Sequence, residues 1–529
     1  MGESALADTG RNFGLSGAAL KWIAMITMLI DHIGAVVMEY GLYYQGGAET
    51  FRRLLDSGNG QWLYTFQRLM RMVGRPSFLL YSFLLVEGFF HTKSRKRYTF
   101  QMLLFAIPLV LGTLFQQLYS FVDTVIVGRF IGVDALAAVG TTYSLNFLIL
   151  GFAQGLCVGF GILLAQQFGA RDRTELNHYF INGCYLSAGI SLFLAVTTCV
   201  GARPLLKFIR TPEEILDMAV LYIQIIFIGI PATVLYNYMA GALRAVGDSR
   251  HPFYYLVISS VLNIILDYLF IVPMNMGVAG AAWATVLSQL VSGILCIWWF
   301  LTKTGVIERK RCFMAFSPYH AKKLCLIGLP MGFEYSVSAI GAVVMQGAIN
   351  SLGSVAVAAQ TAGEKIRQMF TLPMESVGMA MATYVGQNYG AKKIDRIYQG
   401  IRSGLTIQYS YCAVIWVVIF VLKAPLVGLV LSEATSATAT GAVEYLTVMS
   451  ALFFIHGSLM IMRNTLQGLG YSMQAIISGV GELIGRSLGG ILAVRVLGFF
   501  GICIANPLAW GLALCYCIVM VTYYLRKLR

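Results

Sequence analysis

The sequence predicts an all-α polytopic membrane protein whose twelve spanning helices form two parallel six-helix lobes, preceded by two or three extra N-terminal helices. Composition is the first observation behind this prediction: 58% of the 529 residues are hydrophobic, only 12% are charged, and the mean hydropathy is +0.72. No soluble core needs so much apolar material. The second observation is that the chain after residue 100 divides into twelve apolar segments, each of about twenty residues, the length that crosses a bilayer. The third is an internal repeat at a spacing of about 221 residues.

The N-terminal hundred residues contain two apolar segments, LKWIAMITMLIDHIGAVV and SFLLYSFLLVEGFF, and the first includes Asp31 and His32. With the connecting RLMRMVGRP, they resemble the TraX family, membrane proteins associated with N-acetylation of pilin, over residues 15–98. The resemblance stops short of a full member, so we interpret residues 1–98 as a truncated TraX-like segment that adds helices. The alternative is a membrane acyltransferase in which a carboxylate beside the imidazole tunes it as a general base.

The remaining chain repeats itself. Pro108 matches Pro330, QQFGARDRTEL matches GQNYGAKKIDR, and MGVAGAAWA matches LGFFGICIA. Six segments in each half return the chain to its starting side, which predicts parallel repeats related by an axis along the membrane normal. We place the lobes at residues 99–305 and 306–529. Further matched pairs are Gly132 with Gly353, Gly169 with Gly390, and Gly277 with Gly498.

Basic residues produce the net charge of +14, and they gather in short runs on alternate connections. By the positive-inside rule these connections face the cytoplasm, so the charge indicates orientation rather than binding to nucleic acid. We expect a multi-pass protein of the bacterial inner membrane. The cysteines are scattered and the histidines have no partners at ligand spacing, so we assign no disulfide and no metal. The basic runs include 93–97, Arg171 with Arg173, Arg244 with Arg250, 309–311, Lys392 with Lys393, and 526–529.

The strings of this region occur in a recognisable order. P-x-x-x-G and LYSFVDTVIVGRFIG are followed by LAAVG, AQQFGA, NIILDYLFI and GVAGAAWATVLSQ, and then by a weaker second copy. The set closely resembles the multidrug and toxic compound extrusion (MATE) family over about residues 100–525. The resemblance implies a MATE-type fold and a secondary antiporter, not an enzyme, that exports small organic, often cationic, compounds in exchange for protons or sodium ions. It implies alternating access of two lobes, a monomer in the lipid bilayer, and no cofactor.

Four polar residues of the first half are predicted to form the cation-coupling site. Asn263 and Asp267 stand four apart and share one face of a helix. Asp123 and Thr285 fall at a similar depth in the outer half of the membrane. Two close carboxylates with amide and hydroxyl oxygens suit a proton or sodium, and the resemblance implies the same four positions. The alternative is that Asn263 and Asp267 only join helices by hydrogen bonds.

Pro108 lies on the same helix as Asp123, where a missing backbone hydrogen bond favours a bend. We expect ion occupancy to bias this bend and to displace substrate. The second half has no copy of the carboxylate pair. Its Glu334 is a candidate for the substrate cavity, where it would attract cations, and Glu482 with Arg486 is interpreted as a mutually neutralising pair. Other charges of this half, without an assigned role, are Glu364, Lys365, Arg367, Glu375 and Arg463.

The nearest alternative function for the duplicated region is a lipid-linked precursor flippase or polysaccharide exporter with the same architecture. The strings around Asp123 and Asp267 favour multidrug extrusion over this alternative. ATP-driven transport is not supported, because the sequence has no G-x-x-x-x-G-K motif. The sequence leaves the choice between proton and sodium coupling open.

Overall fold

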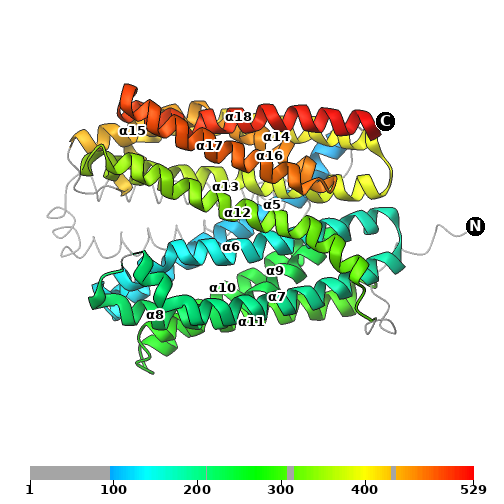
Figure 1. Ribbon diagram of the computed structural model, residues 1–529, viewed down its shortest axis with the longest axis horizontal. Coiled ribbons are helices and arrows are strands. Elements are labelled where there is room, and N and C mark those ends of the chain that lie inside the picture. Colours follow the sequence, from blue (N-terminus) through cyan, green and yellow to red (C-terminus); the bar gives the residue numbers. More distant parts are fainter. Residues whose placement is uncertain (1–95, 210, 307–314, 431–435, 529) are drawn as a thin grey trace, which may run out of the picture. The chain divides into compact units, whose positions relative to one another are not determined.

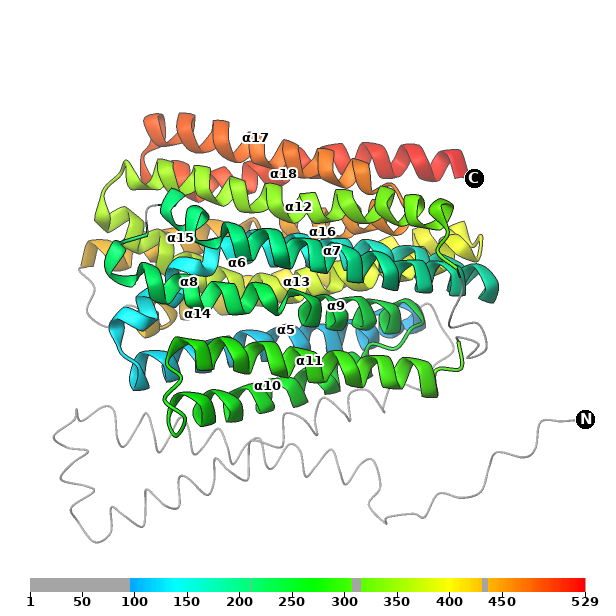
Figure 2. The same cartoon turned by 60° about the horizontal axis from the view of Figure 1, so that its bottom comes forward.

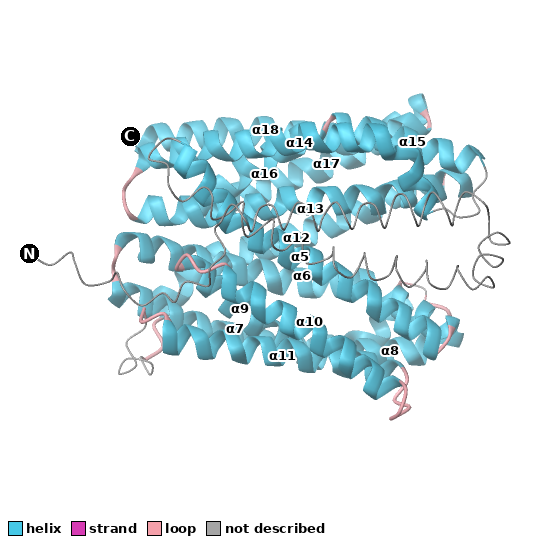
Figure 3. Cartoon of the chain, turned by 180° about the vertical axis from the view of Figure 1, so that it is seen from behind, coloured by secondary structure: helices cyan, strands magenta, loops and turns pink. Residues whose placement is uncertain are grey.

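The computed structural model describes residues 96–209, 211–306, 315–430 and 436–528, and within these ranges all regular structure is α-helical (Figure 3). The prediction of an all-α chain is therefore confirmed. Contacts divide the chain after Phe100 into two units, and the larger unit runs from Gln101 to Arg529. The helix that enters this larger unit begins at Lys96. The N-terminal segments with Asp31 and His32 lie outside the described residues.

The helices of the two halves follow the same order. Those of the first half, here the N lobe, are α5 (Lys96–Phe130), α6 (Val133–Ala170), α7 (Arg173–Phe208), α8 (Glu213–Ile228), α9 (Ile230–Ala245), α10 (Arg250–Ile271) and α11 (Val278–Lys303). Those of the second half, here the C lobe, are α12 (Pro318–Asn350), α13 (Ser354–Gly390), α14 (Ile394–Val430), α15 (Ser436–Ala451), α16 (Phe453–Gly468), α17 (Ser472–Leu497) and α18 (Phe499–Leu528). Figures 1 and 2 show α10 and α11 on the opposite side of this unit from α17 and α18.

Two of the predicted membrane segments are bent. The helices α8 and α9 meet at 44°, and α15 and α16 meet at 49°. The first break falls at Gly229, where Pro231 follows in the first turn of α9 and has no amide hydrogen to continue the helix. The second falls at Leu452 without a proline or a neighbouring glycine. Counting each bent pair as one segment leaves six segments in each half, as the repeat predicts.

The backbone confirms the duplication at single residues. Glycine tolerates positive φ because it has no Cβ, and matched glycines at the helix junctions all use this freedom. Non-glycine residues repeat it between α6 and α7 and between α13 and α14. The pairs are Gly132 with Gly353 (φ 125° and 89°), Arg171 with Lys392 (61° and 56°), Gly247 with Gly470 (92° and 90°), and Gly277 with Gly498 (58° and 58°).

Each lobe has its own buried core, but the first helix of each half is shared. Ala106 of α5 belongs to the cluster of the C lobe, whereas Val127 of the same helix belongs to a cluster of the N lobe. The relation is reversed in α12, where Leu324 packs in the N lobe and Ile349 in the C lobe. Both helices therefore cross from one lobe to the other, and Figure 1 shows α12 running diagonally between them.

The lobes contact each other closely at the basic end, where α6 and α13 terminate. Gln166 Nε2 donates to the Gly468 carbonyl at 3.0 Å, and the matched Gln387 Nε2 donates to the Ala245 carbonyl at 2.8 Å. A Cβ at Gly169 would lie 1.9 Å from the Gln387 carbonyl oxygen, too close for any larger residue. The positive-inside rule assigns this end to the cytoplasm.

Candidate cation-coupling site

Asn263 and Asp267 lie on the buried face of α10, as their spacing predicts. Their side chains are 1% and 0% exposed. Pro252, Tyr255, Leu256, Ser259, Ser260 and Ile271 are buried on the same helix, and α10 packs along α11. Two serines therefore accompany the carboxylate and the amide on this face, and together these four polar residues make up half of the buried residues of α10.

The helix α5 brings Asp123 alongside this face. The ring of Phe115 contacts that of Phe253 at 5.9 Å, and the ring of Phe130 contacts that of Tyr268 at 6.2 Å between centroids. The contacts are equally spaced on both helices, so α5 and α10 run side by side in the same direction. Asp123 lies between the two contacts, and its carboxylate is within electrostatic range of the α10 carboxylate. The predicted pair is therefore assembled.

The polar atoms of this group have no hydrogen-bond partner in the described part of the chain. They are Oδ1 of Asp123, both amide atoms of Asn263, and both carboxylate oxygens of Asp267. An unpaired ionised carboxylate at this depth costs several kcal/mol or more. Carboxylate and amide oxygens are ligands that sodium accepts, and the carboxylates also bind protons. Among the described residues these five atoms make no hydrogen bond between helices, the contact that the structural alternative calls for.

The structure supports the predicted roles of Thr285 and Pro108 less directly. The Thr285 hydroxyl donates to the Ala281 carbonyl of its own helix at 3.1 Å, so the structure does not join it to the carboxylates, although its oxygen keeps a free lone pair. Pro108 lies inside α5, which runs through it without a break. The roles of Thr285 as a ligand and of Pro108 in bending stay predictions.

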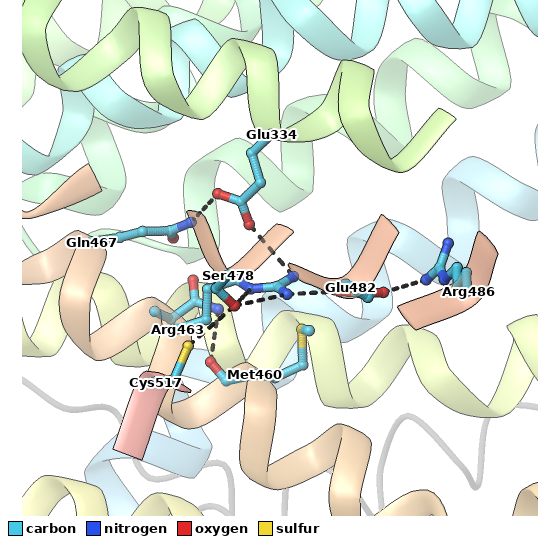
Figure 4. A network of polar contacts seen from close by, with 9 residues as sticks. Glu334, Met460, Arg463, Gln467, Ser478, Glu482, Arg486 and Cys517 are labelled. Carbon is cyan, nitrogen blue, oxygen red and sulfur yellow. Dashed lines mark hydrogen bonds and ion pairs between the residues drawn. The ribbon is translucent and has the colours of Figure 1, made fainter. Parts of the chain in front are cut away.

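The C lobe contains a different arrangement, a buried ion network that joins α12, α16 and α17 (Figure 4). Arg463 of α16 donates to Glu482 of α17 at 2.7 Å and lies 3.5 Å from Glu334 of α12. Glu334 also accepts a hydrogen bond from Gln467 at 2.8 Å, and Glu482 pairs with Arg486, as predicted. Glu334 is only 7% exposed. The guanidinium therefore holds the place beside Glu334 that the cavity prediction gave to an external cation.

A second charged pair lies on α13. Arg367 donates to Glu364 at 2.7 Å, and Tyr445 of α15 donates to the same carboxylate at 2.7 Å. Glu375, farther along α13, is exposed and makes neither an ion pair nor a hydrogen bond with any described residue. The sequence alone assigns no role to Glu375. The polar residues before it on α13 recur at helical spacing, which is a signal that Glu375 lies with them on a water-accessible face of the helix.

Comparison with known proteins decides the family. The sequence profile of the MatE family matches residues 108–269 and 330–488, one range in each half. The chain belongs to the MatE family. The two MatE ranges contain Asp123, Asn263 and Asp267, whereas Thr285 lies between them. A profile described as TraX protein matches residues 16–115, so the TraX-like region extends beyond the expected 98 and overlaps the first MatE range.

Relatives of this MatE protein are named as multidrug resistance proteins. The probable multidrug resistance protein YoeA of Bacillus subtilis (strain 168) is 28% identical over 385 residues, which cover 72% of this chain and 83% of YoeA. YpnP of the same organism, also a probable multidrug resistance protein, is 29% identical over 383 residues, or 71% of this chain and 84% of YpnP. The chain is accordingly a membrane transporter rather than an enzyme.

Solved structures confirm the MatE fold. One described as the outward-facing conformation of a multidrug resistance MATE family transporter of the MOP superfamily superposes with a TM-score of 0.76. It is 22% identical and matches 82% of this chain and 97% of the solved chain. The predicted twelve-segment, two-lobe architecture is therefore correct.

Proposed function

We propose that this MatE protein is a secondary multidrug antiporter that exports organic, often cationic, compounds in exchange for protons or sodium ions. Family membership and the names of YoeA and YpnP support export of organic compounds. The observation that carries ion coupling is the group formed by Asp123, Asn263 and Asp267. Asn263 and Asp267 are buried in the N lobe and Asp123 is half-buried, and all three have buried polar atoms without partners among the described residues. The membership also favours this function over export of lipid-linked precursors.

Coupling requires a group whose ion occupancy differs between two conformations. With the ion bound, the two carboxylates lose part of their mutual repulsion and α5 packs more tightly on α10. With the ion released toward the cytoplasm, repulsion favours separation of the helices. Asp123 stands on α5, which is shared between the lobes, so a change at this carboxylate acts on the contact of α5 with the C lobe. Pro108 supplies the position at which α5 bends.

The test is efflux of a fluorescent cationic dye from proteoliposomes under a proton or a sodium gradient imposed separately. Asp267→Asn and Asp123→Asn remove one charge each and keep the side-chain size. We expect each to reduce gradient-driven efflux by about tenfold or more, as for a coupling energy of about 1–3 kcal/mol. The gradient that drives the parent identifies the ion. Parental efflux in both variants would show that the carboxylates are structural.

A further inference from the structure

The helices α6 and α13 contact each other at the basic end. The sides of the two helices that make this contact can be followed farther along each helix. On α13, Gly386 and Gly390 face α6, where their added Cβ atoms would approach Ala165 and Gln166. Toward the opposite end of α13, the same face carries exposed residues instead of a contact. The two helices therefore touch at one end and line an accessible space between the lobes farther out.

The accessible face of α13 is polar. Thr361, Lys365, Gln368 and Glu375 recur at intervals that place them on one side of the helix, and all four are exposed. Glu375 lies fifteen residues from the end of α13, roughly 22 Å from the basic end at 1.5 Å per residue. A polar stripe at this depth in a spanning helix faces an aqueous cavity rather than lipid, because charged groups in hydrocarbon are costly.

Neighbouring side chains locate Glu375 on the side between the lobes. Its carboxylate is within electrostatic range of Tyr335 on α12. Tyr335 in turn packs against the N lobe, since its Cβ would lie 3.6 Å from a Cβ at Gly151 of α6. The next residue on α13, Ser376, lies 3.4 Å from Thr113 of α5, oxygen to oxygen. Glu375 therefore stands among the helices that join the two lobes.

Among the described residues around Glu375, every guanidinium is already engaged by another carboxylate, so the charge of Glu375 is not neutralised by an ion pair. Three guanidiniums lie in this part of the C lobe, and each is engaged by another carboxylate: Arg367 by Glu364, Arg463 by Glu482 and Glu334, and Arg486 by Glu482. The charged groups that act on Glu375 are Arg367 and Glu482, one of each sign. Lys365 is on the same stripe but ten residues away, roughly 15 Å along the helix. Glu375 is thus the carboxylate that an external cation can neutralise.

The opposing face of α6 is aromatic. Phe147 is 43% exposed and Tyr143 is 68% exposed, and their rings stack at 6.5 Å with an interplanar angle of 16°. Phe147 lies one turn from Gly151, which contacts the C lobe, so this ring borders the same space. An aromatic surface attracts organic cations through the electrons of its faces. A carboxylate on one wall and aromatic rings on the other fit a cationic head on an apolar body.

We propose that Glu375 binds the cationic group of the exported compound, while Tyr143 and Phe147 hold its apolar body. The assignment deepens the proposed function and rests on it for the direction of transport, but binding itself needs no gradient. It replaces Glu334 as the substrate carboxylate, because Arg463 already neutralises Glu334. It also separates the substrate carboxylate, which stands on a C-lobe helix, from the proposed coupling carboxylates of the N lobe.

The experiment is equilibrium binding of radiolabelled tetraphenylphosphonium to the full-length protein in lipid nanodiscs. Glu375→Gln should raise the dissociation constant about tenfold or more, the loss expected for one charge-assisted contact. Phe147→Ala should weaken binding severalfold. The matched control is Glu444→Gln, which makes the same change at an exposed glutamate of α15 within electrostatic range of Cys503 on α18, and it should bind as the parent does.

The inference is overturned if the parent does not bind tetraphenylphosphonium, or if the parent and Glu375→Gln bind it equally well. Equal weakening by Glu375→Gln and Glu444→Gln also overturns it, because the effect would then be general surface charge. Dye efflux in the same variants tests the proposed function separately. Binding that depends on Glu375 in a protein that shows no gradient-driven efflux would uphold the site and reject antiport.

Discussion

Arg463 holds together the buried ion network of the C lobe, and the sequence did not reveal its partners. The spacing of Asn263 and Asp267 was enough to predict a shared face, because both stand on one helix. The partners of Arg463 lie on α12 and α17, more than a hundred residues upstream in one case, and no periodicity connects them. Local pairs such as Glu482 with Arg486 were predictable from their spacing. The guanidinium of Arg463, which neutralises Glu334, could be identified only once the folded structure was known.

Removing Arg463 should destabilise the C lobe strongly. Arg463→Ala leaves Glu334 and Glu482 buried without their common partner, and breaking a buried ion pair in this way costs about 3–5 kcal/mol. We expect a clear fall in the thermal unfolding midpoint of the purified protein. Arg486→Ala is the comparison: Glu482 keeps its bond to Arg463, so the fall should be smaller. A larger fall for Arg486→Ala would contradict this role of Arg463 in the network.

At the scale of elements, twelve segments and their pairing into two halves followed from hydropathy and repeated strings. The bends within two segments did not. Pro231 marks the break between α8 and α9, but its counterpart at Leu452 lacks a residue type that signals a break. The contact between α6 and α13 was also not predictable, since it depends on which end of the transporter is closed. Only the glycines at Gly169 and Gly390 hinted that two backbones approach there.

Filling the contact between α6 and α13 should open the basic end. A Cβ at Gly390 would lie 1.7 Å from the Gln166 carbonyl oxygen, so Gly390→Ala forces the two backbones apart. We expect a cysteine placed at Gln387 to react several times faster with a membrane-impermeant thiol reagent from the cytoplasmic side. The matched control is Gly189→Ala, since Gly189 is a helical glycine with nothing within 4 Å of an added Cβ. Similar rates in both variants would exclude the glycine contact as a closing element.

On the scale of the whole molecule, family, fold class and duplication were all accessible from sequence, because they depend on composition and on the order of strings. The sequence also brought together Asn263 and Asp267 on one helix face of the N lobe, whereas their role in coupling stays a proposal. The sequence did not reveal that α5 and α12 are each shared between the two lobes, because the sequence of each helix indicates only that it belongs to its own half. The boundary with the TraX-like region was placed at 98, and the profile match to 115 shows that the first helix of the MatE fold overlaps it.

Transport should survive removal of the residues before α5. Contacts divide the chain after Phe100, and the MatE match begins at residue 108. A chain that starts with an added methionine before Lys96 retains every described helix of the two lobes. We expect its dye efflux per inserted molecule to stay within about twofold of the parent, since it retains the proposed coupling residues. Loss of efflux from a correctly inserted truncation would give the TraX-like segment a necessary role.

The exchange of α5 and α12 between the lobes also restricts how the protein can move. Ala106 and Leu109 of α5 are packed in the C lobe, and Gly112 already faces α10 of the N lobe. In α12, Met331 is packed in the N lobe, whereas Gly341 faces α17. The matched prolines, Pro108 and Pro330, thus stand where each helix passes from one lobe to the other. Two continuous helices join the lobes, so neither lobe can move independently of the other. We therefore expect both helices, rather than α5 alone, to bend at their prolines when the protein changes conformation.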